Sequence, residues 1–375
     1  MNEPKEQHRY CDIQSLNDPH STLKKFYTVN PIFICVISYT ETSEIPGITM
    51  AGANSELVKY TSAADSEFLY YGRCKCINNV PATPDGKPTP GLITRSALQL
   101  SDIPFLVVDA GSKIKPSIPF ISFSVKPGEN IRSGNAVCFN DVKKLYDYGF
   151  TLGVQLAKTN DLVVVGESIA GGTTTALGVM IALGIDAKFK VSSSMPQNPH
   201  HLKNSVISEA MERSMVFFGD LRDEPFKAIS LFGDPMMPSV AGIASGVIKS
   251  GSRIMLAGGT QMAAVAAILN SLHLPLDNIS IGTTCYVAED CFSNLVELVR
   301  SVSNDIPIYS CNLHLAESVK PGLQAFAKGY VKEGVGAGGI SIASMIKSNG
   351  RINGTVLLKA IELEYENVIE KVLLK

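Results

Sequence analysis

Residues 162–175 read LVVVGESIAGGTTT and are followed by an apolar stretch. The β-branched run predicts a buried strand, the glycines predict a tight turn, and the threonines predict the start of a helix. Backbone N–H groups and hydroxyl groups at such a helix start favour a phosphate. The segment lacks the G-x-x-x-x-G-K-[ST] pattern of nucleoside triphosphate-binding loops. The sequence therefore predicts a phosphate site here, and threonine capping of the helix alone is the structural alternative.

Short apolar runs like this one recur along the chain with helical segments between them. They lie at residues 32–38, 105–108, 162–165, 229–232, 254–257, 279–281 and 306–309. Within residues 140–158, apolar side chains at helical spacing predict a helix that connects two parallel strands. This alternation predicts an α/β fold with a mostly parallel sheet and helices on both faces.

Small and polar residues follow several of the predicted strands. The segments are GE at 166–167, GDP at 233–235, GGT at 258–260 and GTT at 282–284. Because ligands of open parallel sheets bind at the carboxyl ends of the strands, these segments predict one contiguous site. The alternative is that each glycine only ends a strand and begins a turn.

The 375-residue length predicts one large domain with a smaller appendage. Residues 1–30 and the last fifty or so show helical periodicity without obvious strands. We therefore expect a large domain over residues 31–320 and a small helical domain built from residues 1–30 with 321–375. The Pro- and Gly-rich residues 79–91 are expected to form a surface loop, either a lid or a connector.

Charge and cysteine usage limit the classes of partner. A net charge of -2, with both signs scattered, argues against a nucleic acid or an anionic membrane as the partner. The eight cysteines are too sparse for a disulfide framework and are expected to be reduced thiols. Cys74 and Cys76 form a C-x-C pair without a second pair, so no metal site is predicted. With no signal peptide or membrane span in the pattern, we expect a cytoplasmic protein that binds a small molecule.

Two further residues are candidates for chemistry. Glu333 lies in the Gly-rich segment 332–339, just before a predicted helix at 340–346. A carboxylate partly removed from water has a raised pKa and can act as a base, although a helix-start acid is the simpler explanation. Residues 166–170, GESIA, also match the strand, G-x-S-x-[GA] and helix order of a nucleophile elbow. Ser168 would then be a hydrolase nucleophile, with His314 as its partner.

Five short segments, in order, resemble one family, the nicotinate-nucleotide:dimethylbenzimidazole phosphoribosyltransferases, and more closely their archaeal branch. KPGENI at 126–131, the helix from Asp141 and residues 166–174 resemble the family succession G-T-x-N, helix and G-E-M-G-I-G-N-T-T. GDP at 233–235 and GGTQMAA at 258–264 resemble its G-D-P and G-G-F-E-I-A-A. HLAE at 314–317 and EGVGA at 333–337 resemble its H-x-S-A-E and E-G-T-G-A.

The resemblance implies a homodimeric enzyme with a Rossmann-like large domain, a small helical domain from both termini and no cofactor. It would move the ribose-5-phosphate of nicotinate mononucleotide to a lower-ligand base, 5,6-dimethylbenzimidazole or a related benzimidazole or purine. The product would be an α-ribotide for cobamide (vitamin B12) synthesis, and Glu333 would accept the proton of the incoming base. The substrate-binding positions implied are Glu167, Gly171, Gly172, Thr173, Thr174, Lys203, Asp234, Gly258, Gly259, Thr260, Gly282, Thr283, Gly334 and Gly336.

The sequence departs from the family pattern in two places. The family segment D-H-G-V after the first strand is replaced by SYTETSEIPG at 38–47, in the half of the chain that helps form the base pocket. The family segment G-R-G-T-G-L-D-D gives way to SSSMPQN at 192–198. The accepted base and the ribose contacts therefore remain open. A serine hydrolase and a non-catalytic nucleotide-binding protein are the alternative functions.

Overall fold

A mixed sheet forms the centre of the molecule. The computed structural model describes residues 10–18, 23, 29–52, 54, 56–78, 80–83 and 87–371. Its strands follow the order β1-β8-β7-β6-β5-β2-β3-β4, and all neighbours are parallel except β1 and β8. The strands are β1 (Ile13–Asn17), β2 (Pro31–Ile37), β3 (Phe105–Asp109), β4 (Ile121–Ser122), β5 (Leu162–Ser168), β6 (Arg253–Ala257), β7 (Ile279–Thr284) and β8 (Ile308–Cys311). The predicted α/β fold with a mostly parallel sheet is confirmed.

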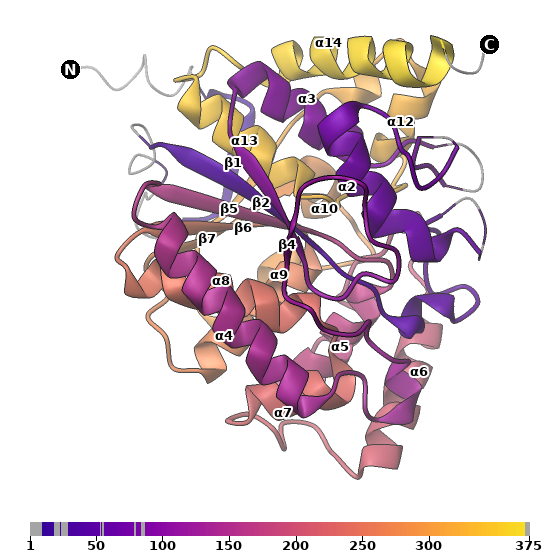
Figure 1. Ribbon diagram of the computed structural model, residues 1–375, viewed down its shortest axis with the longest axis vertical. Coiled ribbons are helices and arrows are strands. Elements are labelled where there is room, and N and C mark those ends of the chain that lie inside the picture. Colours follow the sequence, from indigo (N-terminus) through magenta and orange to yellow (C-terminus); the bar gives the residue numbers. More distant parts are fainter. Residues whose placement is uncertain are drawn as a thin grey trace.

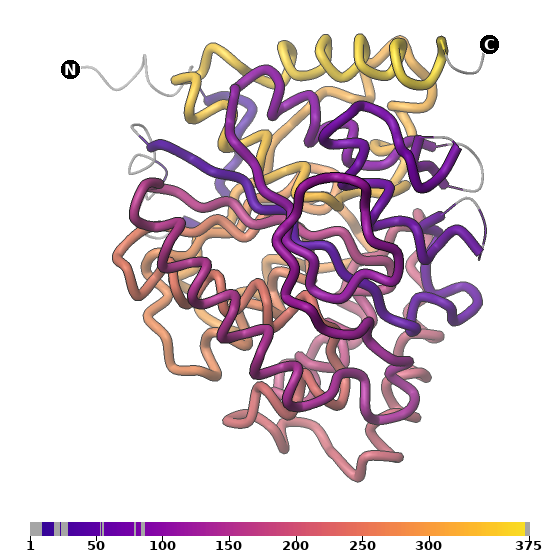
Figure 2. Tube along the Cα trace, viewed as in Figure 1, coloured from indigo at the N-terminus to yellow at the C-terminus, as the bar shows by residue number. Residues whose placement is uncertain are grey.

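Helices cover both faces of this sheet (Figures 1 and 2). One face packs against α4 (Phe139–Leu156), α5 (Gly172–Ala182), α7 (Pro225–Phe232), α8 (Met236–Lys249), α9 (Thr260–Ser271) and α11 (Leu295–Val302). The other packs against α2 (Thr61–Tyr71), α3 (Gly91–Ser101), α12 (Pro321–Ala327), α13 (Ala337–Lys347) and α14 (Gly354–Tyr365). Helix α6 (His200–Ser214) lies beside α5, and the short α10 (Cys285–Ala288) follows β7.

Strand β5 shows why the apolar runs form a central sheet. It is buried over its whole length between β2 and β6. Val163 and Val165 point into the core under α5 and α8, whereas Val164 points into the core under α13. A strand buried on both faces is a continuous apolar run rather than an alternating one. The run therefore ends where Glu167 and Ser168 reach the carboxyl edge of the sheet.

The prediction of a strand at residues 229–232 is wrong. These residues are the last turn of α7, which begins at Pro225 and buries Ala228, Ile229 and Phe232. A short apolar run is compatible with a strand or with the buried face of a helix, and periodicity alone does not separate them. GDP at 233–235 therefore joins α7 to α8 rather than ending a strand.

The two ends of the chain are organised differently from each other. The expectation that residues 1–30 contain no strand is wrong at β1, which pairs antiparallel with β8. Residues 1–9, 19–22 and 24–28 of that expectation lie outside the described residues. Helices α12, α13 and α14 pack beside α3 over one face of the sheet. The division into residues 31–320 and a small helical domain stays a prediction.

In the described part of the chain, no helix meets the length and hydropathy that a membrane span requires.

A hydrogen-bond network around His314 fastens the edge of the sheet to the C-terminal helices. The two ring nitrogens of His314 lie 3.0 Å from Asp12 Oδ1 and 3.0 Å from Glu317 Oε1. Asp12 Oδ2 also accepts the backbone N–H of Gly354, at the start of α14. The hydrogen bond to Asp12, followed by that to Glu317, raises the pKa of His314 above its ordinary value. The protonated ring therefore joins the turn before β1 to the segment after β8.

We predict that His314→Gln destabilises the protein more at low pH than at high pH. Because the folded pKa lies above the unfolded one, the contribution is complete below the unfolded pKa and is lost as pH rises through the folded pKa. The expected loss is about 1 kcal/mol at pH 5.5, since the charged hydrogen bonds are only partly buried. Denaturant unfolding at pH 5.5 and pH 8.5 measures it. The exposed His201→Gln is the control, and equal losses at both pH values would contradict a charged network.

Candidate active site

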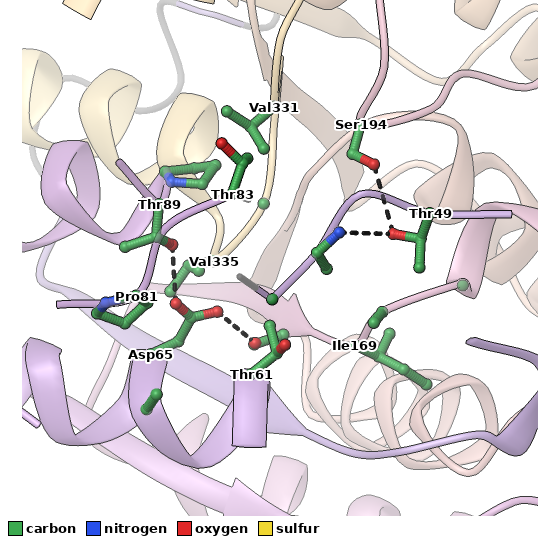
Figure 3. A pocket seen from close by; sticks show the side chains of 18 of the residues that line it. Thr49, Thr61, Asp65, Pro81, Thr83, Thr89, Ile169, Ser194, Val331 and Val335 are labelled. Atoms are coloured by element: carbon green, nitrogen blue, oxygen red, sulfur yellow. Dashed lines mark hydrogen bonds between the residues drawn. The ribbon is translucent and has the colours of Figure 1, made fainter. Parts of the chain in front are cut away.

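A pocket of about 510 Å³ lies at the carboxyl edge of the sheet (Figure 3). This volume is in the range of small-molecule sites, roughly 300–1,000 Å³. Its walls come from the end of β5 with the start of α5, from α2, and from four loops. The loop residues that line it lie at 48–49, 51–52, 76–78, 80–83, 87–90, 192–194, 331 and 333–335, and 259–261 at the start of α9 complete the wall. The described part of the predicted 79–91 loop thus forms one wall of the pocket.

The turn between β5 and α5 presents backbone N–H groups to the pocket. Gly171 has φ +79°, and a Cβ atom there would lie 3.1 Å from Ser43 Cα. Gly172 begins α5, and a Cβ atom there would collide with the Gln261 amide. Gly171, Gly172 and Thr173 line the pocket. Glycine is required here because the backbone must approach its neighbours closely, which leaves the helix N-terminus accessible to an anion.

Two buried lysines stand behind this turn. Lys203 Nζ, on α6, donates to Thr173 Oγ1 (2.9 Å) and to the carbonyl oxygen of Ser192 (2.6 Å), and both acceptors belong to lining residues. Burial and then the charge of Lys332 lower the pKa of Lys203 to about 7. Lys332 Nζ lies 3.1 Å from Asp290 Oδ2. A phosphate at this end of the pocket would meet positive charge that the protein only partly compensates.

Glu333 reaches the pocket from the segment before α13. Its carboxylate accepts the backbone N–H groups of Thr284 (2.9 Å) and Gly338 (3.1 Å) and the hydroxyl of Thr283 (3.3 Å). Burial raises the pKa of Glu333 to about 7, although these donors oppose the shift. Val335, with φ +53°, adopts a backbone conformation that costs free energy for a β-branched residue. The strained turn therefore holds a carboxylate that changes charge near neutral pH.

Glu167 lies at the end of β5, between Glu333 and the phosphate turn. Its side chain is 5% exposed and accepts the Gln261 Nε2–H (2.9 Å) and the backbone N–H of Ile169 (2.9 Å). Burial, followed by the charge of Asp234 and then that of Glu333, raises the pKa of Glu167 to about 8. Burial and the neighbouring negative charges therefore favour the protonated form of Glu167 near neutral pH.

Asp65 on α2 is a pocket residue that sequence reasoning missed. It is 4% exposed, and its two oxygens accept the hydroxyls of Thr89 (2.8 Å) and Ser168 (2.7 Å), as Figure 3 shows for Thr89. Burial raises the pKa of Asp65 to about 6. No motif surrounds this residue, because α2 mixes polar and apolar side chains and is buried nearly throughout. Only the packing of α2 against β2 and β5 brings Asp65 to the site.

The structure brings most of the predicted site residues together. Eight of them line the pocket: Glu167, Gly171, Gly172, Thr173, Gly259, Thr260, Glu333 and Gly334. Lys203 and Thr283 stand behind the wall and hydrogen-bond to lining residues.

The other predicted positions lie outside the lining. Thr174 is fully buried, and Asp234 accepts the Thr175 hydroxyl behind α5. Gly258 packs on Met262. Gly282 and Gly336 permit close packing, of Gly282 on Gly339 and of Gly336 on Phe33 and Gly166.

The hydrolase alternative lacks its geometry. Ser168 Oγ donates to Asp65, and no hydrogen bond joins Ser168 to a histidine in the described part of the chain. His314 is occupied by Asp12 and Glu317 and does not line the pocket. A nucleophilic serine needs a base within hydrogen-bond reach. Ser168 therefore supports Asp65 rather than forming a triad with His314.

Comparisons with known proteins agree with this architecture. Residues 98–284 match a family model described as phosphoribosyltransferase. A UPF0284 protein of Methanothermobacter thermautotrophicus is 43% identical over 320 residues, which cover 84% of this chain and 88% of the relative. A UPF0284 protein of Sulfolobus acidocaldarius is 45% identical over 319 residues, 85% of this chain and 90% of the relative.

Solved structures extend the likeness in fold. The nicotinate-nucleotide-dimethylbenzimidazole phosphoribosyltransferase from Thermus thermophilus superposes with a TM-score of 0.57 at 13% identity, over 99% of this chain and 98% of that one. A structure of CobT from the same organism gives a TM-score of 0.56 at 14% identity, over 93% and 95% of the two chains. The family resemblance inferred from the five segments is thereby confirmed. The chain belongs to the family of the archaeal UPF0284 proteins, and its residues 98–284 match the phosphoribosyltransferase family model.

Proposed function

We propose that the protein transfers the ribose-5-phosphate of nicotinate mononucleotide to a nitrogenous base of the benzimidazole or purine type. The product is an α-ribotide of the kind used in the nucleotide loop of cobamides. One observation carries the proposal: the same pocket combines an anion site at the start of α5 with a carboxylate, Glu333, whose pKa is near neutral. A phosphoribosyl transfer between two rings needs both features.

The phosphate of the nucleotide is assigned to the turn at 171–173. The N-terminus of α5 supplies backbone donors and a partial positive charge, and the Thr173 hydroxyl supplies another donor. Lys203 stands behind Thr173, and an anion there would favour its charged form. The carboxylates of Glu333 and Asp65 repel a phosphate from the rest of the pocket. The ribose and both rings therefore lie along the acidic side.

The reaction is a displacement at the C1′ carbon of the ribose. A ring nitrogen of the incoming base attacks C1′ from the α face, while the bond from C1′ to the nicotinate nitrogen breaks. The bonding electron pair leaves with nicotinate and neutralises its pyridinium ring. The N–H proton of the incoming base moves to the Glu333 carboxylate. The chain's own work is to hold the phosphate, align both rings and accept that proton.

Assembly and location follow the family resemblance. We propose a homodimer in the cytoplasm that needs no cofactor for this transfer. A non-catalytic nucleotide-binding protein is the competing function, and it would bind nicotinate mononucleotide without releasing nicotinate when a base is added.

We predict that Thr173→Val weakens nicotinate mononucleotide binding about tenfold, because a hydroxyl donor to the phosphate and the partner of Lys203 are both lost. Calorimetric titration of the nucleotide gives the dissociation constant. Thr151→Val is the matched control, since the Thr151 hydroxyl bonds only within the exposed side of α4. An unchanged dissociation constant in Thr173→Val would remove the phosphate from this turn.

We predict that Glu333→Gln lowers turnover by about 10²- to 10⁴-fold and leaves nucleotide affinity nearly unchanged. Glutamine keeps the size of the side chain but does not accept the proton of the base. Mass detection of the α-ribotide and of released nicotinate, with a melting temperature on the same sample, separates catalysis from stability. Glu317→Gln, on the exposed carboxylate beside His314, is the control. Undiminished turnover in Glu333→Gln would exclude the proposed proton acceptor.

We predict that turnover falls as the pH is lowered through about 7. Because burial raises the pKa of Glu333 to about 7, protonation below that pH removes the base. The rate should therefore rise between about pH 6 and pH 8 in the parent protein. The residual rate of Glu333→Gln should be nearly flat over that interval. A parent profile that rises toward acid pH would contradict a carboxylate base.

A further inference from the structure

We propose that Asp65 and Thr61 bind the edge of the incoming base that lies opposite its attacking nitrogen. They would thereby select bases that carry a hydroxyl or amino donor on that edge. This inference rests on the proposed transfer, because it assigns the base to the acidic side of that pocket. It names a specificity-determining pair and a substrate class, a heteroaromatic bicycle with a polar donor on the edge opposite the attacking nitrogen.

The two side chains share one face of a helix. Thr61, Ala64 and Asp65 are spaced i, i+3 and i+4 on α2, and all three line the pocket. Figure 3 shows Thr61 and Asp65 side by side at the same wall. Thr89 and Ser168, which lie outside α2, donate hydrogen bonds to the Asp65 carboxylate and fix its position. The helix therefore presents a fixed acceptor and a hydroxyl at one place.

The position of Asp65 suits the far end of a fused bicyclic ring. Glu333 is held over β7 by Thr284, whereas Asp65 is held at β5 by Ser168, with β6 between these strands. Neighbouring strands lie about 4.8 Å apart, so the strands that anchor the two carboxylates, β5 and β7, are roughly 10 Å apart along the sheet edge. A bicycle that gives its N–H to Glu333 can therefore extend its far edge toward Asp65.

Asp65 and Thr61 have unused hydrogen-bonding capacity. A carboxylate accepts about four hydrogen bonds, and within the described residues Asp65 accepts two from side chains, those of Thr89 and Ser168. The Thr61 Oγ1 atom is buried and makes no hydrogen bond within the described residues. A hydroxyl on the base would donate to Asp65 and accept from Thr61. An amino group would donate one hydrogen bond to Asp65 and one to Thr61 Oγ1.

The same pair disfavours other ligand edges. A ring edge with only methyl groups would cover the Asp65 oxygens and leave their remaining lone pairs without donors, which is costly in a buried site. An anionic edge, such as the carboxylate of nicotinate, would be repelled by the negative charge of Asp65. The leaving ring is therefore directed elsewhere, and the place beside Asp65 belongs to the incoming base.

A series of benzimidazoles tests the inference without any substitution. The series is benzimidazole and its 5-hydroxy, 5-amino, 5-methoxy and 5,6-dimethyl derivatives, used with nicotinate mononucleotide for kcat/KM. Calorimetry with ribose 5-phosphate present, which lacks the leaving ring, gives the dissociation constants. We expect the 5-hydroxy or 5-amino base to exceed the 5-methoxy and dimethyl bases by roughly 10- to 100-fold in both measurements. Comparing the 5-hydroxy with the 5-amino base shows which of the two donor groups the pair prefers.

Three variants connect that preference to α2. Asp65→Asn should reduce the preference for the hydroxy over the methoxy base to a few-fold. Thr61→Val, at the start of the helix, should reduce it less. Ser66→Ala is the matched control, because the Ser66 hydroxyl bonds to Ala63 within α2 and does not line the pocket. It should leave the preference unchanged.

The outcomes separate this inference from the proposed transfer. Transfer with an equal preference for methoxy and hydroxy bases, or with a preference that survives in Asp65→Asn and Thr61→Val, overturns the role of the pair and leaves the transfer intact. Binding with the expected preference, but without transfer of any base, supports the pair and overturns the transfer.

Discussion

The active site depends on the contact between the 334–336 turn and the end of β5. The backbone N–H of Val335 donates to the carbonyl oxygen of Glu167 at 2.8 Å, which joins a late segment of the chain to the central strand. This approach is open only to glycine, because a Cβ atom on Gly166 would lie 2.6 Å from Gly336 Cα. Gly336 also has φ +72°. Removing that contact would separate Glu333 from the proposed nucleotide site.

The pocket separates opposite charges along one edge of a sheet. Lys203 and the N-terminus of α5 make one end favourable for an anion, while the carboxylates of Glu333 and Asp65 make the other end acidic. Burying these carboxylates costs free energy, and their raised pKa values show that the protein spends stability on them. Such unfavourable burial is typical of functional sites. In the proposed function, these two ends together orient a dipolar nucleotide.

Local sequence signals predicted the parts of the site that rest on backbone geometry. The β5 run, the glycines at 171 and 172 and the Glu333 segment each combine a strand or helix end with residues that permit close approach. Asp65 was missed because its environment depends on the packing of α2, which no local pattern encodes. Asp234 and the 229–232 run were misplaced because a buried helix and a buried strand have the same short apolar composition. Strand β1 was missed because a five-residue edge strand buries few side chains.

The pairing of β2 with β5 has a consequence for how the chain folds during synthesis. Phe33 pairs with Val164, so the centre of the sheet closes only after a long intervening segment has been made. The nucleotide turn at 171–173 and Lys203 leave the ribosome well before Glu333. Until α13 and α14 follow, the face of the sheet that they share with α2 and α3 is only partly covered and is prone to non-specific association. The proposed anion site can thus form on a growing chain before the proposed proton acceptor exists, so a nucleotide could be bound before the chain is able to consume it.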